Sequence, residues 1–191
     1  MGPAPLRAAA SARTLALALC CCLGVSCGGD GGTSPEAPTA DPTSLAGLFG
    51  STLVRSDGSS VAIQTLQTKA LIGIYFAAGW CPACAAFTPR LVAAYDTLRA
   101  ADASFEIVMV SFDYGAADML AHMKSRGMRW PAVPYESGSR RALADLYGVQ
   151  LIPTLVVIDA GLRTITRDGR DDVAVKGSAA YGDWLAASRG R

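Results

Sequence analysis

The sequence predicts an α/β domain with a central mixed β-sheet and helices on both of its faces. Residues 70–77 and 105–111 are nearly continuous apolar runs, which is typical of strands buried between two layers. Residues 82–101 lie between these runs and carry apolar side chains at helical spacing. A third run, residues 154–159, is followed by a turn and the short segment 163–167, which indicates a hairpin. A strand–helix–strand unit followed by a helix and a hairpin therefore predicts the mixed sheet.

The other elements follow from breaker residues and apolar spacing. Residues 45–49 are predicted to form an apolar turn, and residues 52–63 an N-terminal β-hairpin around a Ser-Asp-Gly-Ser turn. Residues 130–135 hold two prolines within four positions and are predicted to be an extended connection, because each proline removes a helix hydrogen bond. Helical spacing predicts three further helices, two of them ending at a glycine: residues 116–126, 139–147 and 179–188.

The first 26 residues are predicted to be a signal peptide. Arg7 and Arg13 form a positive start without acids, and residues 15–25 are an apolar run too short for a stable membrane anchor. Small residues then precede Cys27, and a glycine-rich stretch follows it. This context resembles a bacterial lipoprotein signal, in which Cys27 becomes the lipidated first residue. We therefore expect export to the periplasm or cell envelope and a lipid anchor in the membrane.

Alternatives to this leader assignment remain open from the sequence. A plain secretory signal would give export without lipid, and palmitoylation of the cysteines at residues 20–22 would suit a eukaryotic protein. Residues 27–44 are rich in Gly, Ser, Pro and Thr and are predicted to be a flexible tether, or an ordinary disordered N-terminus. Residues 45–188 are then the folded domain.

The net charge and the cysteine content limit the classes of function that the chain can have. The formal net charge of the 191-residue chain is +1, so nothing points to nucleic acid or an acidic partner. Of the six cysteines, residues 20–22 leave with the leader and Cys27 carries the lipid, so Cys81 and Cys84 remain. One close pair cannot staple an exported domain of this size, and we infer that the pair serves chemistry.

The Cys81-Pro-Ala-Cys84 stretch has the position expected of a reversible dithiol/disulfide site. It follows the strand at residues 70–77 and opens the helix at residues 82–101. Positions three apart share a helix face, so the two sulfurs can close a disulfide. The helix N-terminus favours the thiolate form of Cys81. The carboxyl end of a parallel strand is also where open α/β sheets place their sites.

Two other uses of the pair have less support. A structural disulfide here would close a very small loop and contribute little stability. A zinc site needs about four ligands, whereas the mature chain offers two cysteines and one histidine, His122. We expect His122, on a helix beside Ala121 and Met123, to be a surface or partly buried residue without a role.

Several motifs together resemble one protein family. They are Trp80-Cys81-Pro82-Ala83-Cys84, Ile152-Pro153-Thr154, and the segments at residues 75–82, 87–91, 130–135, 146–150 and 165–170. These motifs resemble the thioredoxin fold and, within it, the nucleoredoxin/tryparedoxin group. The similarity extends from about Leu53 to Trp184, which is nearly all of the predicted domain.

The resemblance implies a role for each matching residue. Cys81 would attack a substrate disulfide, and Cys84 would resolve the mixed disulfide. The implied substrate-binding surface is made of four residues: Trp80, Pro82, Ile152 and Pro153. Pro153 would be a cis-proline that presents the backbone of Ile152 to an extended substrate segment. In this fold, Asp113 and Tyr114 would lie near the site.

Two departures from the general thioredoxin pattern affect the chemistry. The buried aspartate expected six residues before the first cysteine is replaced by Tyr75, as is usual in the nucleoredoxin/tryparedoxin group. The residue that accepts a proton from Cys84 is therefore not identified by the sequence. The dipeptide between the cysteines is Pro-Ala, where the group has Pro-Pro, and this dipeptide tunes the reduction potential.

The predicted function is an exported, membrane-tethered thiol–disulfide oxidoreductase that reduces protein disulfides as a monomer. It would need no cofactor beyond the Cys81–Cys84 disulfide. Its partners would be protein disulfide or dithiol clients and an electron-donor redox protein, with no nucleic acid. The alternative is a non-catalytic binding or scaffold module that uses the surface around Trp80 and Pro153. A copper or zinc metallochaperone is a third hypothesis.

Overall fold

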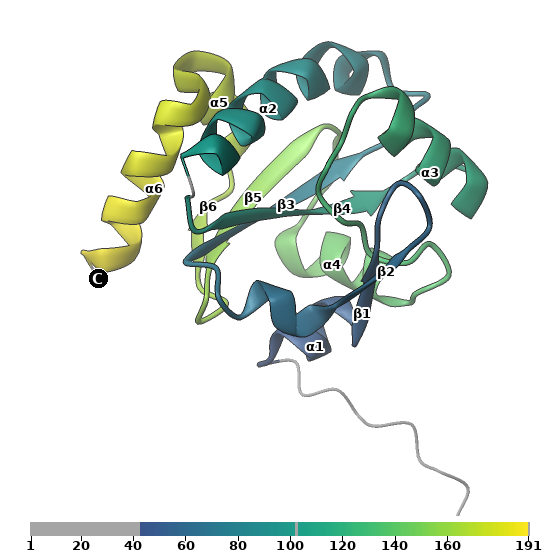
Figure 1. The fold of residues 1–191 in the computed structure, drawn as a ribbon, viewed down its shortest axis with the longest axis horizontal. Coiled ribbons are helices and arrows are strands. Elements are labelled where there is room, and N and C mark those ends of the chain that lie inside the picture. Colours follow the sequence, from purple (N-terminus) through teal and green to yellow (C-terminus); the bar gives the residue numbers. More distant parts are fainter. Residues whose placement is uncertain (1–42, 102, 191) are drawn as a thin grey trace, which may run out of the picture. The chain divides into compact units, whose positions relative to one another are not determined.

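The computed structural model describes residues 43–101 and 103–190 of the chain (Figure 1). The predicted signal peptide, Cys27 and the tether up to residue 42 lie outside the described residues, so these assignments stay predictions. None of the helices in the described part combines the length and hydrophobicity that a bilayer span requires.

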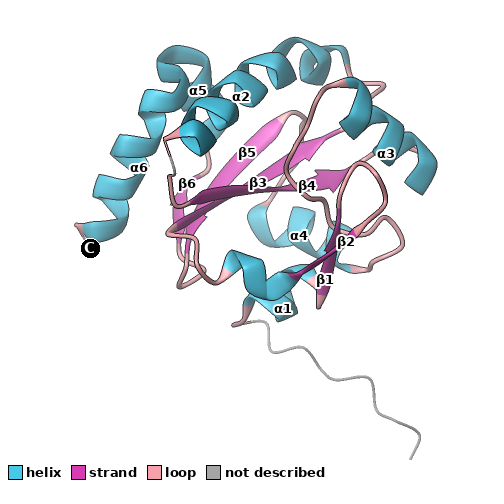
Figure 2. Ribbon diagram, viewed as in Figure 1, coloured by secondary structure: helices cyan, strands magenta, loops and turns pink. Residues whose placement is uncertain are grey.

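A four-stranded mixed sheet forms the centre of the domain (Figure 2). Its strands are β3 (Leu71–Ala77), β4 (Phe105–Ser111), β5 (Thr154–Asp159) and β6 (Thr164–Thr166). In the order β4-β3-β5-β6, β3 pairs parallel with β4 and antiparallel with β5, and β5 pairs antiparallel with β6. Every residue of β3 is buried, because this strand has neighbours on both edges and a layer on each face. The predicted mixed sheet is confirmed.

Helices cover both faces of this sheet (Figure 1). One layer contains α2 (Pro82–Ala100), α3 (Ala116–Ser125), α5 (Gly169–Lys176), the 3₁₀ helix η2 (Gly177–Ala179) and α6 (Ala180–Arg189). The other contains α1 (Leu45–Phe49), the 3₁₀ helix η1 (Ile63–Leu66) and α4 (Ser139–Tyr147). Strand residues alternate between the two cores: Leu71 and Tyr75 pack with the first layer, Ile72 and Ile74 with the second.

The predicted N-terminal hairpin is present as β1 (Thr52–Val54) and β2 (Ser60–Ala62). The extended segment after α3 connects it to the domain, since Ala132 exchanges two backbone hydrogen bonds with Val54. Pro131 and Val133 in turn bond to the backbone of Met109 in β4. The segment with the two prolines is therefore extended, as predicted.

Two local differences from the prediction have physical causes. Residues 45–49 form the short helix α1 rather than a turn, because the Ser44 hydroxyl accepts the Gly47 N–H and caps it. The sequence also gave no sign of α5, whose pattern is polar and whose buried members are Gly169 and Val173. A Cβ at Gly169 would come 2.8 Å from the carbonyl oxygen of Leu155, so α5 depends on close packing against β5.

Candidate active site

The cysteine pair lies where β3 ends and α2 begins. Cys81 is the N-cap of α2, and its Sγ accepts the backbone N–H of Cys84 at 3.1 Å. Pro82 follows at the first helical position, where its missing N–H leaves no hydrogen bond unmade. A sulfur that receives an N–H at a helix N-terminus is well placed to carry negative charge.

The two thiols differ in access to solvent. Both are free thiols, but Cys81 is 5% exposed whereas Cys84 is fully buried. Burial, together with the contact to Cys81, raises the pKa of Cys84 to about 12. Because Cys84 is fully buried, an incoming disulfide can reach only Cys81. Cys84 remains a protonated thiol that needs a proton acceptor before it can attack.

A second chain segment approaches Cys81 from across the site. The Ile152–Pro153 peptide bond is cis, as the resemblance implies, and the Cys81 thiol donates to the Ile152 carbonyl oxygen at 3.7 Å. A shallow hollow of about 190 Å³ opens beside this contact, between Trp80, Phe112 and residues 149–152. The structure thus brings together the predicted residues Trp80, Cys81 and Ile152.

Trp80 forms the exposed rim of this hollow. Its side chain is about half exposed, and its ring stacks on Tyr114 with centroids 6.0 Å apart. Its Nε1–H donates to the carbonyl oxygen of Phe112 at 2.9 Å, which fixes the indole against the end of β4. An exposed aromatic side chain held in one orientation beside a reactive sulfur is suited to contact a partner chain.

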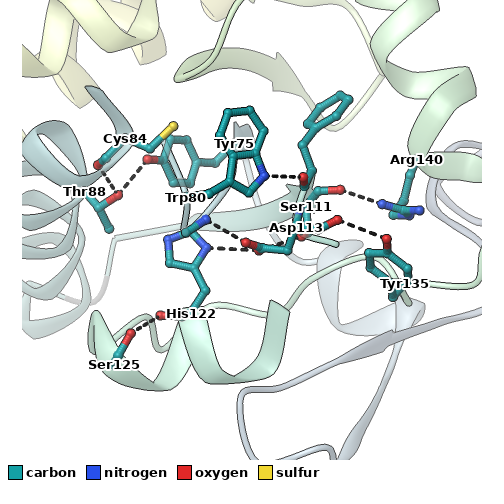
Figure 3. A network of polar contacts seen from close by, with 12 residues as sticks. Tyr75, Trp80, Cys84, Thr88, Ser111, Asp113, His122, Ser125, Tyr135 and Arg140 are labelled. Carbon is teal, nitrogen blue, oxygen red and sulfur yellow. Dashed lines mark hydrogen bonds and ion pairs between the residues drawn. The ribbon is translucent and has the colours of Figure 1, made fainter. Parts of the chain in front are cut away.

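Tyr75 occupies the position of the missing buried acid, but its surroundings keep it neutral (Figure 3). The Thr88 hydroxyl donates to the Cys84 carbonyl oxygen at 2.7 Å, so the Tyr75 hydroxyl is left to donate to Thr88 at 2.8 Å. Burial raises the pKa of Tyr75 well above its usual value. Tyr75 is therefore a structural hydrogen-bond donor and not a proton acceptor.

A buried carboxylate lies on the other side of the cysteine turn (Figure 3). Asp113 accepts the Gly79 N–H at 2.6 Å and the Ser111 hydroxyl at 2.8 Å, and its Oδ2 lies 3.1 Å from Nδ1 of His122. Burial disfavours the charged form of Asp113, but these hydrogen bonds outweigh it and hold the pKa below its usual value.

His122 was expected to be a surface or partly buried residue without a role. The expectation about its exposure is wrong, because His122 is buried. The residue is only 6% exposed and is paired with Asp113. Met119 and Met123, its neighbours on the same face of α3, both pack in the core. That spacing was the available signal, since residues three apart on a helix share a face.

A family model described as thioredoxin-like matches residues 69–164. The chain belongs to the thioredoxin-like family. This membership and the sheet confirm the predicted thioredoxin fold, and they support the predicted enzyme class, a thiol–disulfide oxidoreductase.

Known relatives of the chain are nucleoredoxins. The chain is 41% identical over 122 residues to a nucleoredoxin of Bos taurus, a match that covers 63% of this chain and 27% of the relative. It is 37% identical over 130 residues to a probable nucleoredoxin 3 of Arabidopsis thaliana, covering 68% of this chain and 32% of the relative. The chain thus spans about a third or less of the length of these relatives.

Solved structures of similar proteins cover more of their own length. A thioredoxin from Wuchereria bancrofti is 35% identical, with a TM-score of 0.61, over 73% of this chain and 97% of that one. Tryparedoxin II from Crithidia fasciculata is 31% identical, with a TM-score of 0.64, over 71% of this chain and 89% of that one. These similarities confirm the predicted resemblance to the nucleoredoxin/tryparedoxin group.

Proposed function

We propose that this protein is a thiol–disulfide oxidoreductase that reduces disulfides of client proteins through Cys81 and Cys84. One observation carries the proposal: the solvent-reachable thiol caps the helix and contacts Ile152, while the second thiol lies buried directly behind it. The family of the chain agrees with this activity.

The reaction follows from the difference between the two thiols. The Cys81 thiolate attacks one sulfur of the client disulfide, which forms a mixed disulfide and releases the other client sulfur as a thiolate. The Cys84 thiol then loses its proton and attacks the Cys81 sulfur, so the Cys81–Cys84 disulfide forms and the second client thiolate leaves. Two electrons pass from the protein dithiol to the client. A separate dithiol protein must return them to complete the cycle.

The client would bind as an extended segment beside Cys81. The hollow between Trp80 and residues 149–152 is lined mainly by apolar side chains, and the Ile152 carbonyl points to the reacting sulfur. We expect Trp80, Pro82, Ile152 and Pro153 to contact the client at this surface. Backbone contacts of this kind select for an extended chain more than for a particular sequence.

Export and tethering belong to the proposal through the sequence. The leader, the small residues before Cys27 and the glycine-rich stretch after it support a protein held at the cell-envelope face of a membrane by lipid on Cys27. Replacing Cys27 by alanine should move the full-length protein from the membrane fraction to the soluble fraction and remove the lipid mass. An unchanged distribution would contradict the lipid anchor but not the redox activity.

Insulin reduction tests the enzymatic part. The native protein should reduce insulin disulfides in the presence of dithiothreitol much faster than the Cys81→Ser/Cys84→Ser variant. Equal rates would refute the proposal.

A trapping experiment separates the enzyme from the scaffold alternative. The Cys84→Ser variant cannot resolve a mixed disulfide, so clients should accumulate on Cys81 as adducts that reducing agents release. A binding module would form no such adducts, and their absence would favour the scaffold.

A further inference from the structure

The Asp113–His122 pair lies directly against the turn that carries the cysteines. The Asp113 carboxylate receives the N–H of Gly79, two residues before Cys81, at 2.6 Å. A Cβ at Gly79 would lie 3.1 Å from Oδ1 of Asp113 and 3.2 Å from Cγ of His122, so a side chain there would press on both. Glycine at this position allows the backbone of the turn to approach the pair closely.

The hydrogen-bonding pattern leaves one ring nitrogen of His122 unused. The carboxylate of Asp113 only accepts hydrogen bonds, so the Nδ1 that faces it carries the hydrogen. In neutral His122 the Nε2 atom is then a proton acceptor, and it is buried without a partner among the described residues. Figure 3 shows this nitrogen on the side of the ring away from Asp113, which in this view is the side of Thr88 on α2.

A buried acceptor without a partner costs free energy, because it has lost its hydrogen bonds to water, and a catalytic role is one reason for a folded protein to keep such a group. Solvent is close, since Gly79, Trp80, Asp113 and His122 line an open hollow of about 390 Å³. A histidine whose Nδ1–H is held by a carboxylate is the common arrangement for a side chain that accepts a proton at Nε2 near neutral pH.

We propose that the Asp113–His122 pair is the proton acceptor for Cys84 in the resolving step, in place of the acid absent at Tyr75. This inference rests on the proposed function. As the Cys84 sulfur attacks Cys81, its proton passes through water to Nε2 of His122, and the second client sulfur leaves as a thiolate. The imidazolium then returns the proton to that thiolate or to solvent, and the pair itself gains and loses no electrons.

The charges around the pair favour this transfer. The negative charge of Asp113 is among the causes that raise the pKa of Cys84, after burial and the contact with Cys81. When His122 takes up the proton, the pair becomes neutral overall and this repulsion of the Cys84 thiolate disappears.

Other groups contact or line the pair but offer no competing buried base. Asp118 on α3 is exposed, and Tyr114 lines the same hollow. The Tyr135 hydroxyl donates to the Asp113 carbonyl oxygen, and Arg140 donates to the Ser111 carbonyl oxygen. From β3 and α2 the facing titratable groups are Tyr75, Cys81 and Cys84.

A rapid-mixing experiment isolates the resolving step. The four cysteines at residues 20–22 and 27 are replaced by serine in the full-length protein, so that Cys81 and Cys84 are the remaining thiols. The reduced protein is mixed with 5,5′-dithiobis(2-nitrobenzoate), and the coloured thiolate is released in two phases. The first phase reports attack by Cys81, and the second, independent of reagent concentration, reports resolution by Cys84. Both phases are followed from acidic to alkaline pH for the native protein, His122→Asn, Asp113→Asn and Asp118→Asn.

The substitutions are matched to the proposal. Asparagine at 122 can still donate to Asp113 but cannot take up a proton, and Asp118→Asn removes an equal charge from the same hollow. Near neutral pH the second phase should slow on the order of a hundredfold in His122→Asn and Asp113→Asn. It should approach the native rate in alkaline buffer, where hydroxide removes the proton. The first phase and the Asp118→Asn control should be unchanged.

The outcomes separate the hypotheses. A uniform slowing at every pH, or a pH profile like that of the native protein, would overturn the assignment of the pair as proton acceptor. If one substitution prevents folding, the other supplies the same test. Absence of a second phase in the native protein would instead refute the proposed function.

Discussion

Replacing Asp113 by asparagine should destabilise the domain by an amount that depends on pH. The carboxylate is buried and accepts three hydrogen bonds, from Gly79, Ser111 and His122. An asparagine can keep the Gly79 bond through its oxygen, but its NH₂ then faces the two other donors. The substitution therefore breaks or reverses bonds that the charged oxygen now accepts.

The expected loss follows from the value of such bonds. Hydrogen bonds to a charged group contribute about 1.5–3 kcal/mol each, and reorientation of the Ser111 hydroxyl recovers part of one. We therefore expect the free energy of unfolding to fall by about 2–4 kcal/mol near neutral pH. Because the pKa of Asp113 is lowered in the folded protein, its contribution is present above the unfolded value of 3.8 and is lost as pH falls through the folded value.

Urea denaturation followed by tryptophan fluorescence measures this difference. The deficit of Asp113→Asn should be large near neutral pH and should shrink in strongly acidic buffer. Asp118→Asn, an exposed acid on the same helix layer, should stay within about 0.5 kcal/mol of the native protein. A deficit equal to that of the control, or one that does not change with pH, would refute the role given to the Asp113 hydrogen bonds.

Three further predictions concern the cysteine turn and its neighbours. Tyr75→Phe should cost about 1 kcal/mol of stability in urea denaturation, because Thr88 loses a buried donor, yet leave the insulin-reduction rate unchanged. The reduced domain should lose stability as pH rises from 9.0 toward 12, because the raised pKa of Cys84 favours the folded state only below that range. Melting temperatures of reduced and oxidised protein should therefore diverge in alkaline buffer. Trp80→Ala should slow reduction of a protein disulfide about tenfold and spare a small aromatic disulfide.

Each of these has an outcome against it. If Tyr75→Phe shifted the pH profile of the insulin-reduction rate, the phenol would take part in proton transfer. If the melting temperatures of the reduced and oxidised forms changed with pH in the same way, this would contradict the raised pKa of the buried Cys84 thiol. Equal slowing of large and small disulfides by Trp80→Ala would mean that the indole acts on Cys81 itself and not on the client.

The sequence predicted most of the fold because its central strands have a strong local signal. β3, β4 and β5 are apolar along most of their length, and α3 and α4 are followed by Gly127 and Gly148. α5 had no such signal, since its place is decided by the close approach of Gly169 to Leu155. Packing between distant segments is not encoded in local periodicity, and this helix could not be found from spacing alone.

The residues of the site also differ in whether a local motif or packing between distant segments reveals them. Cys81, Cys84 and Trp80 are adjacent in the chain, and the motif was enough to find them. Asp113 and His122 meet Gly79 from a strand end and a separate helix, and their contacts span 34 and nine positions of sequence. The resemblance placed Asp113 near the site, but its hydrogen bond to Gly79 and its pairing with His122 became visible only once β4 and α3 were folded against β3.

A redox titration of the cysteine pair tests the central claim most directly. The full-length protein is equilibrated in glutathione buffers of graded ratio, acid-quenched, and its free thiols at Cys81 and Cys84 are counted by mass after alkylation. We predict one reversible transition in which both thiols disappear together as a single two-electron couple, absent in Cys81→Ser. Thiols that persist under oxidising buffers, or that are lost one at a time as glutathione adducts, would contradict the account.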